Sequence, residues 1–412
     1  MKAFIAKNYV LILFALALLI FLSLLFFWRS FNIKQKFPVS PLINSINYTT
    51  NESYELKNLK VKSYGFLPFW SVDSYVPNYN AITDLAYFSL YLNANGTIKK
   101  QTKPGVLEPG YRNLKDNKKI KDILNQATKN GVRTSLTISL HNNKEIEEFL
   151  NCSSCWFYSY DELNSIISTY GFSGLNFDFE YIGNAPISLS NKYTDYIEYM
   201  SSKFKASRGS DFQIVISVFA DSAKKPRLTD IEGLNKIKID YLFIMAYDFF
   251  VPTSPTSGPI APIGGAPERY KYDLNLMFKD FREKISPNKL ILGIAFYGHN
   301  WVVQTHTPLA IRIPGNPYLG YSISQNYKDI AQKIVQDNLT VGWDSIAQAP
   351  FIDYYKGSVA RKVYFENSKS ISKKIELAQK NLFAGVGIWA LGYDGKYKDL
   401  INLYKDYLDK NN

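Results

Sequence analysis

The sequence predicts an α/β protein in which eight parallel strands and their connecting helices close into a (β/α)8 barrel. Three observations favour this fold. The chain has 412 residues, enough for one large barrel. Eight short apolar runs alternate with helical stretches between residues 64 and 389. Charged and large polar residues gather at the carboxyl ends of these runs, which is the rim where barrels build their sites.

The predicted strands are short and rich in β-branched and aromatic residues. In chain order they are expected at residues 64–69, within 81–92, and at 134–140, 174–180, 213–220, 241–247, 289–297 and 385–389. Helices are expected at 118–130, 161–170 and 187–205. An open, doubly wound sheet is the alternative. It would need a Gly-rich phosphate-binding turn after the first strand, which Tyr64–Trp70 does not supply.

The fourth predicted strand carries the most informative pattern. From Leu175 to Glu180 apolar and polar residues alternate, so that Asn176, Asp178 and Glu180 share one face. The two carboxylates lie within about 7 Å of each other along the strand. Their repulsion should raise one pKa and hold a proton near neutrality. Such a pair suits glycoside cleavage, whereas the alternative is a half-exposed strand with a solvated polar face.

Composition limits the partners. The net charge is +12, which favours anionic surroundings such as phospholipid head groups or acidic wall polymers, or reflects a bias toward Lys codons. No arginine-rich tract or nucleic-acid motif accompanies this charge, so no nucleic-acid partner is expected. No Gly-rich phosphate loop is apparent, and no cofactor is expected. We expect a monomer.

Cysteine and histidine are scarce. Cys152 and Cys155 form one Cys-Ser-Ser-Cys motif, which in an exported protein predicts a local disulfide, with a redox role as the alternative. His141, His299 and His306 are the three histidines of the chain. They form no apparent cluster, so no metal site is predicted.

The amino-terminal segment predicts a membrane anchor. Residues 9–28 are uncharged and mostly apolar, long enough to cross a bilayer as one helix. Residues 1–8 would be a short cytoplasmic tail, and residues 29–60 a flexible tether. The run ends without an Ala-x-Ala type site, so retention in the cell membrane, single-pass with the catalytic part extracytoplasmic, is favoured over cleavage and secretion.

Residues 61–408 resemble glycoside hydrolase family 18, the chitinase-like enzymes. Ser173-x-x-Asn176-x-Asp178-x-Glu180 is similar to the Asp-x-x-Asp-x-Asp-x-Glu motif of the fourth strand in that family. Further similar segments follow in the family's order: Tyr64–Trp70, Met245–Asp248, Gly293–Gly298 and Gly387–Gly392. Gly258–Pro262 and Val363–Asn367 look most like the bacterial branch that acts on peptidoglycan of spores and cell walls, in which an Asn at position 176 is common.

The resemblance implies substrate-assisted, retaining hydrolysis. Glu180 would be the general acid and then the base, and Asp178 would orient the 2-acetamido group of the sugar. Tyr247 would donate a hydrogen bond to that group. Four further residues are implied in the substrate site: Trp389 as its apolar floor, Asn176 as a partner of Asp178, and Asp248 and Tyr297 as wall residues. Ordinary core packing is the alternative for Trp389 and Tyr297.

Other aromatic residues are weaker candidates. Trp70, Trp301 and Trp343 could stack on sugars in outer subsites or pack in loops. Residues 299–361 lengthen the connection between strands seven and eight, and the resemblance implies a small α+β insertion there, with a helix at 327–336 and Trp343 and Tyr354 as wall aromatics. His299 and His306 would be loop residues.

The function predicted from this resemblance is cleavage of β-1,4 linkages in N-acetylglucosamine-containing glycans. The alternatives are a non-catalytic chitinase-like protein that binds carbohydrate and a wall-bound scaffold that uses its basic surface. Chitin, peptidoglycan and N-linked glycans all carry the required acetamido group, so the polymer stays open at this point, as does endo or exo action.

Overall fold

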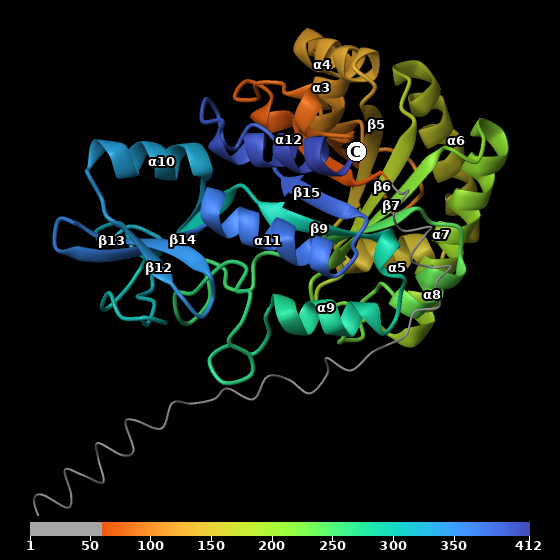
Figure 1. Ribbon diagram of the computed structural model, residues 1–412. Helices are drawn as coiled ribbons and strands as arrows, with labels where there is room; N and C mark the ends of the chain where they lie inside the picture. Colours follow the sequence, from red (N-terminus) through yellow and green to blue (C-terminus); the bar gives the residue numbers. More distant parts are fainter. Residues whose placement is uncertain (1–59) are drawn as a thin grey trace, which may run out of the picture. The chain divides into compact units, whose positions relative to one another are not determined.

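A computed structural model describes residues 60–412 of the chain (Figure 1). Eight parallel strands form a closed barrel in the order β1-β15-β9-β8-β7-β6-β5-β2, as the sequence predicts. Their bounds are β1 Lys62–Pro68, β2 Asp84–Tyr91, β5 Arg133–Leu140, β6 Gly174–Phe179, β7 Gln213–Phe219, β8 Tyr241–Met245, β9 Leu290–Ala295 and β15 Gly385–Trp389.

Helices cover the outside of the barrel. They are α3 Pro109–Asp116, α4 Lys118–Lys129, α5 Asn143–Leu150, α6 Ser153–Tyr170, α7 Ile187–Arg208, α8 Ile231–Lys236, α9 Leu274–Arg282, α11 Ser368–Lys380 and α12 Asp399–Asn411. The alternation in β6 explains this covering. Phe177 points outward and lies 5.7 Å, centroid to centroid, from Tyr196 of α7, while Asn176 and Asp178 face the barrel interior.

One helix begins earlier than predicted. The sequence predicts a helix over 161–170, and α6 runs from Ser153. The disulfide between Cys152 and Cys155 lies at its first turn, and Trp156 packs against Tyr196 of α7. Gly171, in the left-handed conformation (φ 73°), ends α6 and turns the chain toward β6.

An antiparallel sheet is inserted between β9 and β15, as predicted. Its strands lie in the order β11 Ile323–Asn326, β10 Tyr297–Val302, β14 Val359–Phe365, β13 Ala349–Lys356 and β12 Val341–Asp344, with helix α10 Tyr327–Gln336 between β11 and β12. This sheet and α10 project from one side of the barrel (Figure 1). A short hairpin, β3 Gln101–Lys103 and β4 Val106–Leu107, follows β2.

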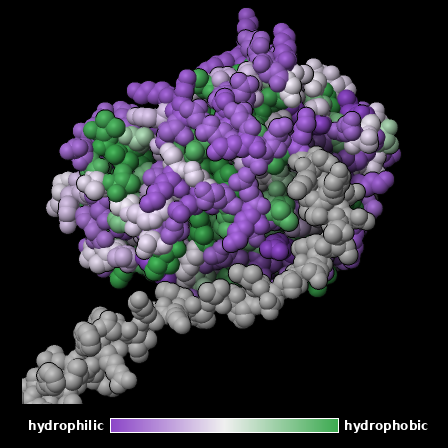
Figure 2. All heavy atoms as spheres, in the orientation of Figure 1, coloured by the Kyte–Doolittle hydropathy of each residue, from purple (hydrophilic) through white to green (hydrophobic). Residues whose placement is uncertain are grey.

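The surface seen from this side is mainly hydrophilic, with an apolar area on the side where α10 lies (Figure 2). Val335 of α10 and Val341 of β12 are among the exposed apolar side chains of the structure. The apolar side chains of the barrel strands are instead buried, either under the helices or in the barrel interior.

The predicted membrane location is corrected. Within residues 60–412, no helix has both the length and the apolar character needed to span a bilayer. The longest of these helices, α7, has 22 residues but carries charged side chains such as Lys192, Asp195 and Lys203, as a helix on a barrel surface does. The predicted tail 1–8, span 9–28 and nearly all of the tether 29–60 lie outside the described residues. The described residues thus do not support the predicted location in the cell membrane.

Candidate active site

The acidic residues of the predicted motif lie at the carboxyl end of β6. Asp178 is opposite Ser139 in the register of β6 with β5, and the Glu180 N–H donates to the carbonyl of Leu140 at 3.0 Å. This register places the residue that follows β5, His141, directly beside both carboxylates. The Asp178 side chain is 3% exposed and that of Glu180 is 30% exposed, so Glu180 is the more accessible of the two carboxyls.

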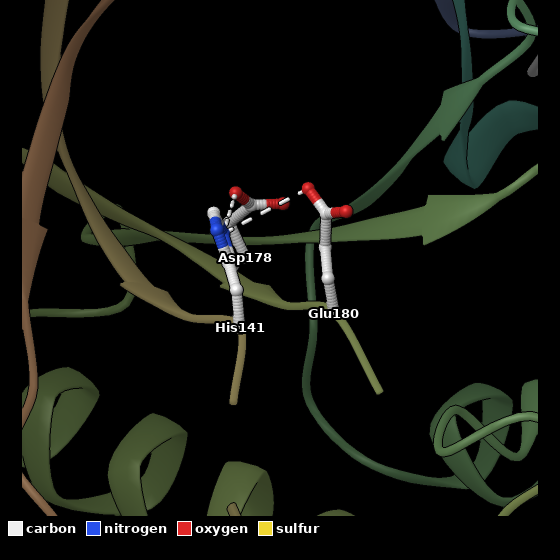
Figure 3. Close-up of side chains that lie close together, drawn as sticks. All are labelled: His141, Asp178 and Glu180. Atoms are coloured by element: carbon white, nitrogen blue, oxygen red, sulfur yellow. Dashed lines mark hydrogen bonds and ion pairs between the residues drawn. The ribbon is translucent and has the colours of Figure 1, made fainter. Parts of the chain in front are cut away.

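His141, Asp178 and Glu180 form a compact cluster (Figure 3). The His141 Nε2 lies 3.1 Å from Asp178 Oδ2 and 3.7 Å from Glu180 Oε1. One donor atom from each residue lies within 4.8 Å of the others. Three converging donors could also approach a metal ion, since three is the number of protein ligands in a catalytic zinc site. The hydrogen bond between His141 and Asp178 accounts for their closeness.

The surroundings of the cluster favour a proton on Glu180 near neutral pH. Burial raises the pKa of Glu180 to about 7, the charges of Asp178 and Asp248 add to this effect, and the charge of His141 opposes it. Burial also lowers the pKa of His141, but the hydrogen bond and negative charge of Asp178 outweigh burial and raise it. The carboxyl with the elevated pKa, expected from the repulsion of the pair, is therefore Glu180.

Tyr247 and Asp248 follow β8 after a single residue and lie on the same rim. Burial, and then the charges of Asp178 and Asp248, raise the pKa of the Tyr247 hydroxyl far above its ordinary value, so it remains a hydrogen-bond donor. Asp248 Oδ1 accepts from the Tyr297 hydroxyl at 2.6 Å and lies 2.9 Å from His299 Nε2. The first strand of the insertion, β10, thus supports the end of β8.

The cluster of His141, Asp178 and Glu180 lines one cleft together with Tyr247 and Asp248, and this cleft has a volume of about 1080 Å³. The predicted site residues that line it are Trp70, Asp178, Glu180, Tyr247, Asp248 and Trp389. Trp389, at the end of β15, packs edge-on against Phe66 and Phe88 of β1 and β2, with centroid distances of 5.7 and 4.6 Å. Trp70 is 50% exposed, and its Nε1 donates to the Tyr393 hydroxyl at 3.1 Å.

Two predicted substrate residues lie elsewhere. Asn176 is fully buried one pleat below Asp178, where its Oδ1 accepts from Ser217 Oγ at 3.1 Å. Tyr297 is buried behind Asp248. Within residues 60–412 neither is among the side chains that line the cleft. Each can therefore act on substrate only through a neighbouring residue. Asn176 precedes Asp178 by two positions on the same face of β6, so it lies deeper inside the barrel.

Three further expectations are corrected. Trp301 is completely buried and donates to the carbonyl of Val251, so it cannot stack on a sugar. His299 is part of β10 rather than a loop, and it is buried between Asp248 and Ser324. Trp343 and Tyr354 lie under Lys369 and Lys333, respectively, and not among the residues described as lining the cleft.

Sequence reasoning missed some residues that line the cleft. His141 had a signal, because it directly follows the predicted third strand, and parallel strands end at one rim. The cations Lys225, Arg227 and Lys271 also line the cleft, but they belong to connections whose paths the sequence does not reveal.

A (β/α)8 barrel whose rim holds a buried carboxylate beside a half-exposed acid of pKa about 7 defines a barrel glycosidase. The family model for "Glycosyl hydrolases family 18" matches residues 44–394. The chain therefore belongs to glycosyl hydrolases family 18, and it is a chitinase-like glycosidase.

Curated relatives agree with this assignment. A Dictyostelium discoideum protein described as "Probable di-N-acetylchitobiase 1" is 28% identical over 295 residues, which cover 65% of this chain and 74% of that protein. The "Cortical fragment-lytic enzyme" of Bacillus anthracis is 23% identical over 320 residues, which cover 76% of this chain and 65% of that enzyme.

Solved structures share the fold. The Group IV chitinase of Ostrinia furnacalis, in complex with allosamidin, superimposes with a TM-score of 0.73 at 18% identity, covering 85% of this chain and 99% of that one. A family 18 chitinase from Cycas revoluta, in complex with (GlcNAc)4, gives a TM-score of 0.70 at 18% identity, covering 84% and 99%.

Proposed function

We propose that the domain formed by residues 61–408 hydrolyses β-1,4 linkages that follow N-acetylglucosamine in peptidoglycan- or chitin-type glycans. The observation that carries this proposal is the placement of Glu180 in the lining of the cleft, beside His141 and the buried Asp178, where burial raises the pKa of Glu180 to about 7. Such an acid holds a proton at neutral pH and can release it to a glycosidic oxygen. The printed names of the relatives, a chitobiase and a cortical fragment-lytic enzyme, favour the same substrates.

The mechanism is retaining and substrate-assisted. Glu180 donates its proton to the glycosidic oxygen while the acetamido oxygen of the substrate attacks C1, which breaks the C1–O bond and forms a cyclic oxazolinium ion. The carboxylate of Glu180 then takes a proton from water, whose oxygen attacks C1 and reopens the ring. Two displacements at C1 restore the original anomeric configuration.

Three other side chains position the reacting groups. Asp178 orients the acetamido N–H and stabilises the positive charge of the ring, and the hydrogen bond from His141 fixes its carboxylate. The Tyr247 hydroxyl donates to the acetamido carbonyl. Trp389 forms an apolar floor supported by Phe66 and Phe88.

Replacing the acid tests this proposal. Glu180→Gln keeps the shape of the side chain but removes the titrating proton, so turnover of N-acetylglucosamine oligomers should fall by at least about 10²-fold. New reducing ends, with their anomeric configuration read by proton NMR, give the rate and the stereochemistry. Glu148→Gln, on the exposed face of α5, is the matched control and should behave as wild type.

The outcomes separate the alternatives. Wild-type turnover by Glu180→Gln would contradict the role of Glu180, and an inverted product would contradict the mechanism. A wild-type protein that binds the oligomers but releases no reducing ends would instead support the non-catalytic carbohydrate-binding alternative.

A further inference from the structure

The two sides of the cleft differ in chemistry. In the closed ring of strands, β7 is four places from β1 in either direction, so these strands lie opposite each other. Trp70, directly after β1, presents an exposed indole at one side. Asp221, two residues beyond β7, and its cationic neighbours occupy the other side. The acid Glu180, at the end of β6, stands between them.

The β7 side carries an excess of positive charge. Asp221 accepts from Arg227 through two bonds of 2.9 Å, and Lys225 Nζ lies 2.7 Å from the same carboxylate. The Asp221 carboxylate thus holds two cations in place, and its single negative charge offsets only one of their two positive charges. The side chain of Lys225 is 54% exposed, so its ammonium group remains accessible to a ligand.

Lys271 adds a third cation from the connection after β8. It is exposed and lines the same cleft, and among residues 60–412 no carboxylate forms a salt bridge with it. Lys224 lies behind this group, with its Nζ 4.9 Å from the ring centre of Tyr272. The nearby Arg269 contributes no excess charge because Asp344 neutralises it at 2.9 Å.

A neutral polymer would leave the excess positive charge on this side of the cleft without a counter-charge. Covering charged groups with a sugar chain removes water from them, and this is unfavourable unless the ligand supplies opposite charge. A carboxylate on the polymer would supply that charge and would also be attracted into the cleft before contact. Chitin and peptidoglycan both carry the acetamido group that the mechanism requires. The cationic side of the cleft favours peptidoglycan, because peptidoglycan also carries carboxylates.

We propose that Lys225 and Lys271, beside the Asp221–Arg227 pair, bind a carboxylate carried by the glycan, so that the substrate is an acidic polymer of N-acetylated amino sugars of the peptidoglycan type and not neutral chitin. The inference rests on the proposed function, because it assigns the substrate class of the same cleft. The carboxylate can belong to the lactyl group on the sugar or to an attached peptide. Both sources present the same chemistry to the two lysines.

Matched substrates test this inference. Peptidoglycan strands stripped of peptides, which keep free lactyl carboxylates, are compared with the same strands after those carboxylates become methylamides. A third arm uses strands that still carry their peptides. The quantity measured is kcat/KM for each acidic substrate divided by kcat/KM for the methylamide strands, at low and at high salt.

Each lysine should contribute about threefold to this ratio, as partly exposed ion pairs do. The wild type should favour an acidic strand about tenfold at low salt and much less at 1 M salt. The double variant Lys225→Gln/Lys271→Gln should bring the ratio close to one, and Lys271→Glu should lower it further than Lys271→Gln does. Lys410→Gln, on the exposed end of α12, is the matched control and should keep the wild-type ratio.

The three substrates and the double variant distinguish the possible outcomes. A preference seen only with peptide-bearing strands assigns the carboxylate to the peptide. Equal ratios in the wild type and the double variant, with both acidic substrates, would overturn the inference. Cleavage of the methylamide strands in that case leaves the proposed function intact. No cleavage of any strand, with turnover of N-acetylglucosamine oligomers retained, would overturn the inference alone, and no turnover of strands or oligomers would overturn both.

Discussion

The properties of Glu180 arise from three neighbours and from its partial burial. Burial and the charges of Asp178 and Asp248 raise its pKa to about 7, and the charge of His141 lowers it. The hydrogen bond to His141 also fixes one oxygen of Asp178 on the side facing β5. A single histidine, beyond the end of a neighbouring strand, thus affects both the orientation and the titration of the acid pair.

The pH dependence of activity follows from this arrangement. The first step needs protonated Glu180, so kcat/KM should fall as pH rises through about 7. In His141→Gln the positive charge that lowers the pKa of Glu180 is lost, so the alkaline limb should move to higher pH. His306→Gln, which alters a histidine beside Tyr355 and outside the described lining of the cleft, should leave the limb in place.

The measurement is kcat/KM for an N-acetylglucosamine oligomer from pH 5 to 9. An alkaline limb that stays fixed in His141→Gln, or that moves to lower pH, would contradict the assigned electrostatics.

Sequence reasoning reached the acid pair because both carboxylates lie on one strand, where a period of two places them on the same face. The ends of the predicted strands placed Tyr247 and Trp389 at the rim, and the family resemblance supplied their roles. His141 was missed because its closeness to Asp178 depends on the register of β5 with β6, which the sequence of either strand does not specify. Asn176 was assigned to the substrate site although it lies one pleat too deep.

At the scale of elements, the floor of the cleft depends on two glycines. Phe243 of β8 fills the barrel interior and packs edge-on against Phe66, which contacts Trp389. A Cβ at Gly387 of β15 would lie 2.2 Å from the Phe243 ring, and one at Gly293 of β9 would lie 2.6 Å from it. These strands lack side chains at the two positions, and this absence makes room for the aromatic layer.

Gly387→Ala should therefore destabilise the protein by about 1–3 kcal/mol, since an added methyl forces the ring to move. It should also lower kcat, because the displaced Phe243 and Phe66 no longer support Trp389. Urea unfolding and oligomer turnover measure the two effects. Gly264→Ala, whose new Cβ would have ordinary contacts at 3.5 Å, is the control and should change the free energy of unfolding by less than about 0.5 kcal/mol. Equal stability of the two variants would contradict this account.

The barrel strands were predictable at this scale because each is a short apolar run between turns. The inserted sheet was harder to predict: the strand-like runs at 341–343 and 351–355 correspond to β12 and β13, whereas strands β10, β11 and β14 were not expected. β10 follows β9 after a single residue, so the two read as one run, and β14 contains Arg361 and Lys362, both buried through ion pairs or carbonyl contacts. Burial of these cations depends on partners distant in sequence.

At the scale of the whole molecule, the ring of strands sets the direction of the cleft. The first and last barrel strands, β1 and β15, are far apart in sequence but adjacent in the ring, and they bring aromatic side chains to one flank of the acid, while the connection after β7 brings cations to the other flank. Alternation of strands and helices was sufficient to predict the ring itself. The chemistry of its flanks was not predictable, because it depends on the paths of the connections after β7 and β8.

The central claim is that the acetamido group of the substrate acts as the nucleophile while Glu180 supplies the proton. The most direct test is kcat/KM of the wild type for a series of aryl glycosides of N-acetylglucosamine in which the acetyl methyl carries zero, one, two or three fluorine atoms. Fluorine withdraws electrons from the attacking oxygen, so the rate should fall steeply and steadily along the series. A rate that does not change with fluorination would show that the acetamido oxygen does not attack C1 and would contradict the mechanism.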